Sequence, residues 1–371
     1  MERLGDGVGG GGGDLAQICS MQIHNFSAGP CILPQVVLEQ AADAVRNWNG
    51  TGLSLIEVSH RGKAFESVME EARQLVKELL HLPERYEVLF LQGGATLGFY
   101  TVAMNFLPEG GRAAYVDTGT WAAGAIKEAR MVGQVEVVAS SAASNHNHIP
   151  KGFAVPADAA YLHVTTNNTI FGTQYHPYPT APVPLIGDMS SDIFSRPFDA
   201  SPYACIYAGA QKNMGPAGTV VYIVDREALG KTGRKLPTYL DLAQHIDKDS
   251  MLNTPPVFAV YTTMLMLRWM KAEGGVPAME ARNRAKAELL YAEIDRNPRF
   301  QGHAVPEDRS WMNATFTLTN PDDATAFDAA WKAAGISGIA GHRSVGGYRA
   351  SMYNALPLSS VEALVNVMAT F

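Results

Sequence analysis

A single lysine, Lys212, lies in a polar turn between two apolar runs of the sequence. The turn reads GAQKNMGPAG (209–218), and the runs ACIYAG (204–209) and TVVYIV (219–224) have the length and content of buried strands. Most lysines in turns are solvated surface groups. A lysine held at the end of a strand can instead form a covalent bond with a carbonyl compound.

Three other features that could take part in binding or catalysis lie at the ends of predicted strands. The turn GGAT (93–96) joins a strand predicted at 86–92 to a helix, and backbone N–H groups at a helix start bind phosphate. Asp188 ends an apolar run, and Trp121 opens a helix just after another strand. Each has an ordinary explanation too, because glycine turns are common and an Asp after a strand often caps a turn.

Together the four features match the needs of pyridoxal phosphate. This cofactor requires a lysine for its Schiff base, a carboxylate against its pyridine nitrogen, a flat partner for its ring and a phosphate site. Asp188 precedes Lys212 by 24 residues with one predicted strand between them, so both side chains can reach the same edge of a sheet. The sequence therefore predicts a pyridoxal-phosphate site.

The segments around these residues alternate between strand and helix patterns. Such alternation indicates an α/β fold with a mostly parallel sheet, flanked by helices on both faces, that binds ligands at the carboxyl ends of its strands. Helices are predicted at 65–80, after 93–94 and at 121–131, and strands at 86–92, 113–119, 135–139, 160–165, 183–188, 204–209 and 219–224.

The pattern changes at about Pro255 and predicts a smaller C-terminal α/β domain. The elements expected after this point are helices at 257–275, 278–295, 323–335 and 359–371 and a strand at 312–319. We expect an N-terminal segment at 21–34, a large cofactor-binding domain at 35–275 and a small domain at 276–371.

Residues 1–20 form a glycine-rich leader that we expect to be disordered, because it holds too few apolar groups to offset its chain entropy. Its G-x-G-x-x-G match at Gly7, Gly9 and Gly12 has no strand before it and no helix after it. We therefore do not interpret it as a nucleotide site.

Composition excludes several classes of function. The chain has 371 residues, 29 basic and 36 acidic, with a net charge of -7, which argues against a general binder of nucleic acids or anionic membranes. No apolar run reaches membrane-spanning length. Cys19, Cys31 and Cys205 are too few and scattered for a disulfide framework or zinc site, which favours the cytoplasm. His146 and His148, in a predicted loop, make a poor metal site.

The chain resembles the phosphoserine aminotransferases, which belong to the class V, fold-type I pyridoxal-phosphate enzymes. The similarity runs from Asn25 to the C-terminus. It is carried by SHRGK (59–63), LQGGAT (91–96), YVDTGTWAAGAIKEA (115–129), DMSSDIFSRPFD (188–199), YAGAQKNMGPAG (207–218), LNTPP (252–256) and GHRSVGGYRASMYNA (341–355).

This resemblance implies amino transfer between glutamate and 3-phosphohydroxypyruvate, giving 2-oxoglutarate and phosphoserine in serine biosynthesis. Bacterial members of the family often also aminate the phosphorylated ketoacid of the pyridoxine route. The resemblance further implies a homodimer with shared active sites and small-molecule substrates only.

The resemblance also assigns cofactor contacts. Lys212 would form the Schiff base and move a proton, Asp188 would pair with the pyridinium nitrogen, Trp121 would stack on the ring and Thr169 would bond the ring hydroxyl oxygen. The phosphate would be held by Ala95, Thr96 and Gln211, and by Asn253 and Thr254 of the neighbouring subunit.

Substrate recognition needs cations, because both substrates carry two anionic groups and guanidinium groups bind carboxylate and phosphate bidentately. The resemblance assigns Arg349 to the α-carboxylate. A subsite for the substrate phosphate and the distal carboxylate of glutamate would comprise His60, Arg61, His342 and Arg343.

Two positions depart from the family pattern. Thr96 stands where many relatives have arginine or serine, and Ala28 stands where many have a second serine near bound glutamate. We expect these changes to affect substrate affinity and to leave the chemistry at Lys212 intact.

Three alternatives compete with amino transfer to 3-phosphohydroxypyruvate. A cysteine desulfurase would need a nucleophilic cysteine near the C-terminus, and no cysteine follows Cys205. The alternative of an alanine–glyoxylate aminotransferase stays open, although the small substrates of such an enzyme need fewer arginines for binding. A non-catalytic cofactor binder would have no use for Arg349 or for the two His–Arg pairs.

Overall fold

The computed structural model describes residues 23–371, so the predicted leader lies outside the described residues. The helices are α1 (Gln35–Arg46), α2 (Lys63–Leu79), α3 (Gly94–Phe106), α4 (Thr120–Arg130), α5 (Leu242–Ile246), α6 (Val257–Ala272), α7 (Gly275–Arg296), α8 (Ala324–Ala333) and α9 (Leu358–Thr370). The strands are β1 (His24–Asn25), β2 (Tyr86–Leu91), β3 (Arg112–Asp117), β4 (Gln134–Ser140), β5 (Leu162–Thr165), β6 (Asn167–Asn168), β7 (Thr173–Gln174), β8 (Leu185–Asp188), β9 (Tyr203–Gly209), β10 (Val220–Asp225), β11 (Phe300–Gly302), β12 (Asn313–Leu318), β13 (Ile336–Ser337) and β14 (Tyr348–Ser351).

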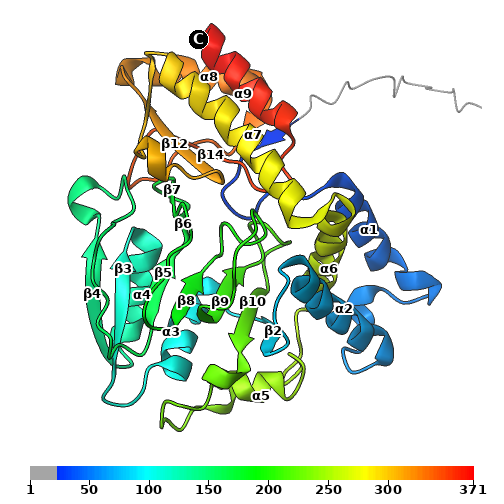
Figure 1. The fold of residues 1–371 in the computed structure, drawn as a ribbon. Helices are drawn as coiled ribbons and strands as arrows, with labels where there is room; N and C mark the ends of the chain where they lie inside the picture. The colour runs from blue at the N-terminus through cyan, green and yellow to red at the C-terminus, as the bar shows by residue number, and fades with distance from the viewer. Residues whose placement is uncertain (1–22) are drawn as a thin grey trace, which may run out of the picture.

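A seven-stranded sheet with the order β2-β10-β9-β8-β5-β3-β4 forms the centre of the larger part (Figure 1). Neighbouring strands of this sheet are parallel, except that β10 is antiparallel to both β9 and β2. The direct turn from β9 to β10 explains this exception, because a short connection can join only antiparallel neighbours. The predicted α/β fold with a mostly parallel sheet is confirmed.

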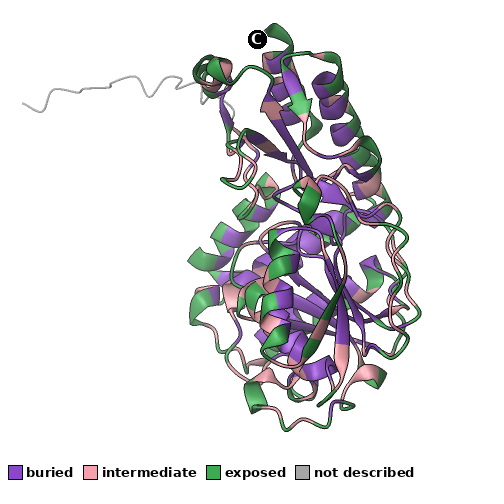
Figure 2. Ribbon diagram, turned by 90° about the vertical axis from the view of Figure 1, so that its left-hand side faces the viewer, coloured by how far each residue is buried: buried purple, intermediate pink, exposed green. Residues whose placement is uncertain are grey.

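Both faces of this sheet are covered, as the sequence pattern predicts. On β9, Ile206 and Ala208 belong to the same hydrophobic cluster as α2 and α6, whereas Cys205 and Tyr207 belong to the cluster with α3 and α4. Successive side chains of a strand point to opposite faces, so one continuous apolar strand serves two cores. Figure 2 accordingly shows buried strands between helices whose outer faces are exposed.

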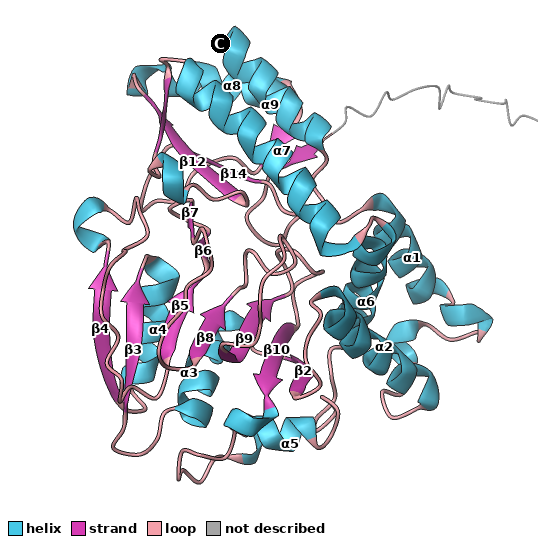
Figure 3. Cartoon of the chain, in the orientation of Figure 1, coloured by secondary structure: helices cyan, strands magenta, loops and turns pink. Residues whose placement is uncertain are grey.

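A second, smaller sheet of antiparallel strands, β11-β12-β14, packs with α7, α8 and α9 (Figure 3). The N-terminal strand β1 pairs in parallel with β13, so the start of the described chain joins the C-terminal part. The boundary predicted at 275/276 falls at the first residue of α7. Within residues 23–371 no helix is both long and apolar enough to cross a membrane.

Candidate active site

Lys212 lies in the turn after β9, where contacts from distant segments hold it. The N–H of Cys31 donates to the carbonyl of Gln211 at 3.0 Å, and the Cys31 thiol contacts the carbonyl of Lys212, so the N-terminal segment passes over the turn. The ammonium of Lys212 donates to the hydroxyl of Thr169 at 2.7 Å. Its Nζ lies 5.8 Å from the centroid of the Trp121 ring.

Asp188 ends β8, directly beside β9, and its side chain is buried. Its Oδ1 accepts bonds from the N–H and hydroxyl of Ser190 at 3.0 and 2.6 Å, so the carboxylate does cap a turn. Both bonds use the same oxygen, which leaves Oδ2 for a ligand. Burial raises the pKa of Asp188, while the Ser190 bonds and the charge of Lys212 oppose that rise.

The glycine turn before α3 presents unused backbone donors. Gly93 and Gly94 have φ angles of 104° and 64°, and a Cβ on Gly93 would lie 2.4 Å from the Leu97 side chain, so only glycine fits there. No side chain caps α3. Its first N–H groups therefore need partners from outside the helix, as phosphate oxygens would provide.

These groups converge on one cavity. Of the predicted cofactor residues, it brings together Ala95, Thr96, Trp121, Asp188, Gln211 and Lys212. The full lining is Gly94, Ala95, Thr96, Phe99, Trp121, Thr165, Asn167, Asp188, Ser190, Ser191, Gln211 and Lys212. Thr169 joins the site through its bond to Lys212.

Arg349 of β14 reaches this site from the smaller sheet. Its Nη1 donates to the carbonyl of Thr169 at 3.5 Å, and its buried Nε has no hydrogen-bond partner among residues 23–371. Removal from water lowers the pKa of Arg349. A buried guanidinium N–H without a partner favours an anionic ligand, because leaving it unpaired costs free energy.

His342 and Arg343 precede β14 in a turn near Arg349. Burial lowers the pKa of His342, and the charges of Arg349 and Arg343 lower it further, so three basic groups share one neighbourhood. Ala28 is held by a residue that follows β14, because its carbonyl accepts a hydrogen bond from the Tyr353 hydroxyl at 2.8 Å.

Nine predicted residues do not line this cavity, and five of them have been placed above: Ala28, Thr169, His342, Arg343 and Arg349. The other four are His60, Arg61, Asn253 and Thr254. The Nε2 of His60 is buried without a partner, and Arg61 is exposed. Asn253 donates from Nδ2 to Oε1 of Gln92 at 2.8 Å, and Thr254 is exposed.

Sequence reasoning gave no role to several residues of the cavity. Thr165 ends β5, and its buried hydroxyl has no hydrogen-bond partner among the described residues. Its position at the carboxyl end of a predicted strand is the one feature of the sequence that could have indicated a role in the site. Asn167 and Ser191 also line the cavity, and they bond each other at 2.8 Å. Short polar side chains are too common for their types alone to reveal this.

The two loop histidines take part in ordinary packing. His146 packs on the Phe171 ring with centroids 4.8 Å apart, and Nδ1 of His148 lies 3.0 Å from the Ser144 hydroxyl. In the described part of the chain, no group of three or more His, Cys, Asp or Glu side chains could hold a metal ion.

The donor set of the cavity fits pyridoxal phosphate. An amine, a buried carboxylate with one oxygen free, an indole and an uncapped helix start face one space, and these are the partners that its aldehyde, ring nitrogen, ring face and phosphate require. The unpartnered hydroxyl of Thr165 offers one further contact.

Comparison with known proteins identifies the class. The model of the family Aminotransferase class-V matches residues 23–364. The chain therefore belongs to the class-V aminotransferases, which accords with its fold and with a lysine, an aspartate and a phosphate site around one cavity.

Within that class the relatives are phosphoserine aminotransferases. One from Flavobacterium psychrophilum is 60% identical over 349 residues, covering 94% of this chain and 98% of its own. Another from Bacteroides fragilis is 54% identical over 353 residues, covering 95% and 99%. The predicted resemblance is confirmed.

Solved structures of phosphoserine aminotransferases have the same fold as this chain. The phosphoserine aminotransferase of Bacillus circulans subsp. alkalophilus has a TM-score of 0.91 at 45% identity, covering 95% of this chain and 98% of its own. That of Trichomonas vaginalis, solved with pyridoxal phosphate bound, has a TM-score of 0.89 at 37% identity, covering 94% and 100%.

Proposed function

We propose that this protein is a transaminase that moves an amino group between glutamate and 3-phosphohydroxypyruvate, giving 2-oxoglutarate and O-phosphoserine for serine biosynthesis. The observation that carries the proposal is the convergence of Lys212, Asp188 and Trp121 on one cavity at the start of α3. Family membership and the close relatives support both the activity and pyridoxal phosphate as the cofactor.

Bound pyridoxal phosphate supplies an electron sink for negative charge that develops at the α-carbon of the substrate. Lys212 would hold the cofactor through its amine, and Asp188 would keep the ring nitrogen protonated through its free oxygen. Trp121 would pack against the ring, and Thr169 would contact the ring hydroxyl. The N–H groups at Ala95 and Thr96, with Gln211, would bind the phosphate.

Lys212 is suited to both of its roles by its environment. Burial lowers its pKa to about 8, with the charge of Asp188 opposing and that of Arg349 adding to the effect. The neutral amine is therefore accessible near neutral pH. A neutral amine can attack a carbonyl and can accept a proton from the α-carbon.

Arg349 would bind the α-carboxylate that both substrates share, since its Nε has no protein partner. His342 and Arg343 would contact the second anionic group, together with His60 and Arg61. This set of cations suits substrates with two anionic ends better than alanine or glyoxylate.

The thiols argue against desulfurase chemistry. Burial raises the pKa of Cys31 to about 12 and raises that of the fully buried Cys205 still further. Both stay protonated at neutral pH, and the thiol is a far weaker nucleophile than the thiolate. Within residues 23–371 these two cysteines form no disulfide, which supports our inference of a reducing, cytoplasmic location.

We also infer a homodimer with shared active sites. His60, Arg61 and Thr254 do not line the cavity of their own chain, which supports a role for them in the site of a second copy. Exposed apolar side chains supply a surface for that contact; they are Val36, Leu38, Val45, Leu53 and Ile56, from α1 and the segment between α1 and His60.

A mixing experiment tests the shared site. Lys212→Ala and the double variant Asn253→Ala/Thr254→Ala should each be impaired alone. In a mixed dimer, one site would join an intact lysine to intact Asn253 and Thr254, so subunit exchange should restore up to half of wild-type activity per dimer. If the double variant is impaired and exchange restores nothing, these residues act in their own chain.

Steady-state assays test the activity itself. Glutamate should yield 2-oxoglutarate rapidly with 3-phosphohydroxypyruvate and poorly with glyoxylate. The phosphorylated ketoacid of the pyridoxine route carries the same carboxylate, ketone and phosphate groups, so we propose it as a second substrate for the same assay. Equal turnover with glyoxylate would overturn the proposed specificity.

A further inference from the structure

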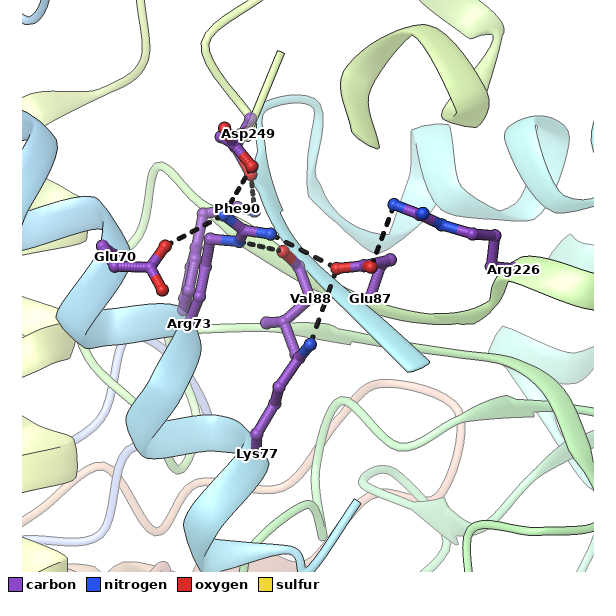
Figure 4. Close-up of polar contacts among 9 residues, drawn as sticks. Glu70, Arg73, Lys77, Glu87, Val88, Phe90, Arg226 and Asp249 are labelled. Carbon is purple, nitrogen blue, oxygen red and sulfur yellow. Dashed lines mark hydrogen bonds and ion pairs between the residues drawn. The ribbon is translucent and has the colours of Figure 1, made fainter. Parts of the chain in front are cut away.

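Arg73 of α2 is the centre of a polar cluster beside the large sheet (Figure 4). Its side chain is largely buried, and its Nε donates to the carbonyl of Val88 at 3.0 Å. Its Nη1 donates to Asp249 at 2.7 Å and to Glu70 at 3.1 Å, and its Nη2 donates to Glu87 at 3.3 Å. One guanidinium thus joins a helix, a strand and the segment after α5.

That segment follows the outer edge of β2, which is the terminal strand of the sheet. Arg73 bonds the carbonyl of Val88, the N–H of Phe90 donates to the Ser250 hydroxyl at 3.1 Å, and Asn253 bonds the side chain of Gln92. The first two contacts use backbone groups two residues apart on the open edge of β2, where alternate residues expose their backbone groups on the same side, and the third uses the side chain of Gln92 just beyond the strand. They end beside the glycine turn that starts α3.

The chain turns sharply after α5, where the N–H groups of Asp249 and Ser250 donate to the carbonyls of Ile246 and His245 at 3.1 and 2.9 Å, and side-chain contacts tie this turn to its surroundings. Asp249 and Ser250 have φ angles of 49° and 69°, in the left-handed region that residues other than glycine occupy at a cost. Asp249 is held by Arg73 and Ser250 by Phe90. The conformation at these two residues sets the direction in which the chain continues to Asn253 and Thr254.

We propose that Arg73 is a positioning residue for the cofactor: by holding the side chain of Asp249, it fixes the turn from which Asn253 and Thr254 reach the cofactor phosphate in the partner subunit. This inference rests on the shared active site proposed above. It assigns a function in the neighbouring site to a side chain that does not line the cavity of its own chain.

A second arginine of the cluster, Arg226, provides a matched control for the replacement of Arg73. Nη2 of Arg226 lies 3.0 Å from Oε1 of Glu87 and Nζ of Lys77 lies 3.6 Å from Oε2, so Glu87 keeps two cationic partners when Arg73 is replaced. Arg226 pairs with Glu87, and in the described part of the chain no hydrogen bond or ion pair joins it to the segment from Asp249 to Asn253. A variant of Arg226 therefore removes a charge from the cluster without releasing that segment.

The test measures the dissociation constant of pyridoxal phosphate for the cofactor-stripped dimer, by absorbance titration. Arg73→Met and Asp249→Ala should each weaken binding about fivefold or more, as expected when contacts worth about 1 kcal/mol are lost. Arg226→Met should bind as wild type does. Asp249→Ala alters an exposed side chain and should therefore fold, so it tests the proposal if Arg73→Met does not fold.

A double-mutant cycle separates positioning from general destabilisation. In the background of Asn253→Ala/Thr254→Ala, adding Asp249→Ala should weaken cofactor binding no further, because the groups that it positions are gone. An equal further loss, or an equal effect of Arg226→Met, would overturn the role of Arg73. If Asn253→Ala/Thr254→Ala itself binds cofactor normally, the inference and the shared phosphate contact both fail, while the aminotransfer activity is tested separately by its own assay.

Discussion

The ammonium of Lys212 and the hydroxyl of Thr169 are joined by a hydrogen bond of 2.7 Å, and the carbonyl of the same threonine accepts a bond from Arg349. Thr169 therefore lies between the amine that would hold the cofactor and the guanidinium that would hold the substrate carboxylate. Lys212 belongs to the turn after β9, and Arg349 to the smaller sheet. This one residue links the chemistry of the two parts of the chain.

Thr169→Val should weaken cofactor binding, because valine keeps the shape of threonine and removes its hydroxyl. A buried hydrogen bond contributes about 1 kcal/mol, so we expect about a fivefold rise in the dissociation constant. Thr169→Ser, which keeps the hydroxyl, is the matched control and should stay close to wild type. Weaker binding in the serine variant but not in the valine variant would contradict this role.

Asp188→Asn should leave the cofactor bound but slow proton removal from the substrate by more than about tenfold. The amide oxygen can still accept the bonds from Ser190, so the turn is preserved. The neutral amide cannot hold a positive charge on the ring nitrogen. Stopped-flow absorbance of the half-reaction with glutamate measures the rate, and a wild-type rate would mean that another group does this work.

Arg349→Lys should raise the Michaelis constants of glutamate and phosphoserine together, because both carry an α-carboxylate. A lysine cannot reproduce the bidentate geometry of guanidinium, so about a tenfold rise is expected. Arg343→Lys is the comparison, since it should disturb the second anionic group instead. Unchanged Michaelis constants for both substrates in Arg349→Lys would show that the carboxylate binds elsewhere.

The pKa of Lys212 predicts how cofactor capture depends on pH. Burial lowers this pKa from 10.5 to about 8, and only the neutral amine attacks the aldehyde. In the cofactor-free protein, the rate of covalent capture should therefore rise through about pH 8 and then level off. A rate that keeps rising to pH 10 would indicate an ordinary, solvated lysine.

Much of the fold could be predicted because the strands of the large sheet are continuous apolar runs. The strand expected at 183–188 starts only at Leu185, because Pro184 lacks the N–H that a ladder requires. The short strands β6, β7, β11 and β14 were not expected. Their few residues carry no clear period: β6 and β7 have two residues each and pair with each other, and β14 includes Arg349 and pairs with β12, some 30 residues earlier in the chain.

The centre of the candidate site could be predicted for a related reason. Asp188 and Lys212 stand at the ends of predicted strands, and parallel strands bring their carboxyl ends to one edge. The contact between Arg73 and Asp249 spans 176 residues and has no local signal in the sequence. The predicted roles of Asn253 and Thr254 depend on a second subunit, so they stay proposals.

One measurement tests the central claim most directly: the absorbance spectrum of the cofactor-loaded protein during a single cycle. Glutamate alone should remove the visible band of the lysine-bound cofactor and produce the band of its amine form, and 3-phosphohydroxypyruvate should then restore the first band. Lys212→Ala should show neither change. A spectrum that glutamate leaves unaltered, or one that glyoxylate restores as fast as 3-phosphohydroxypyruvate does, would contradict the account.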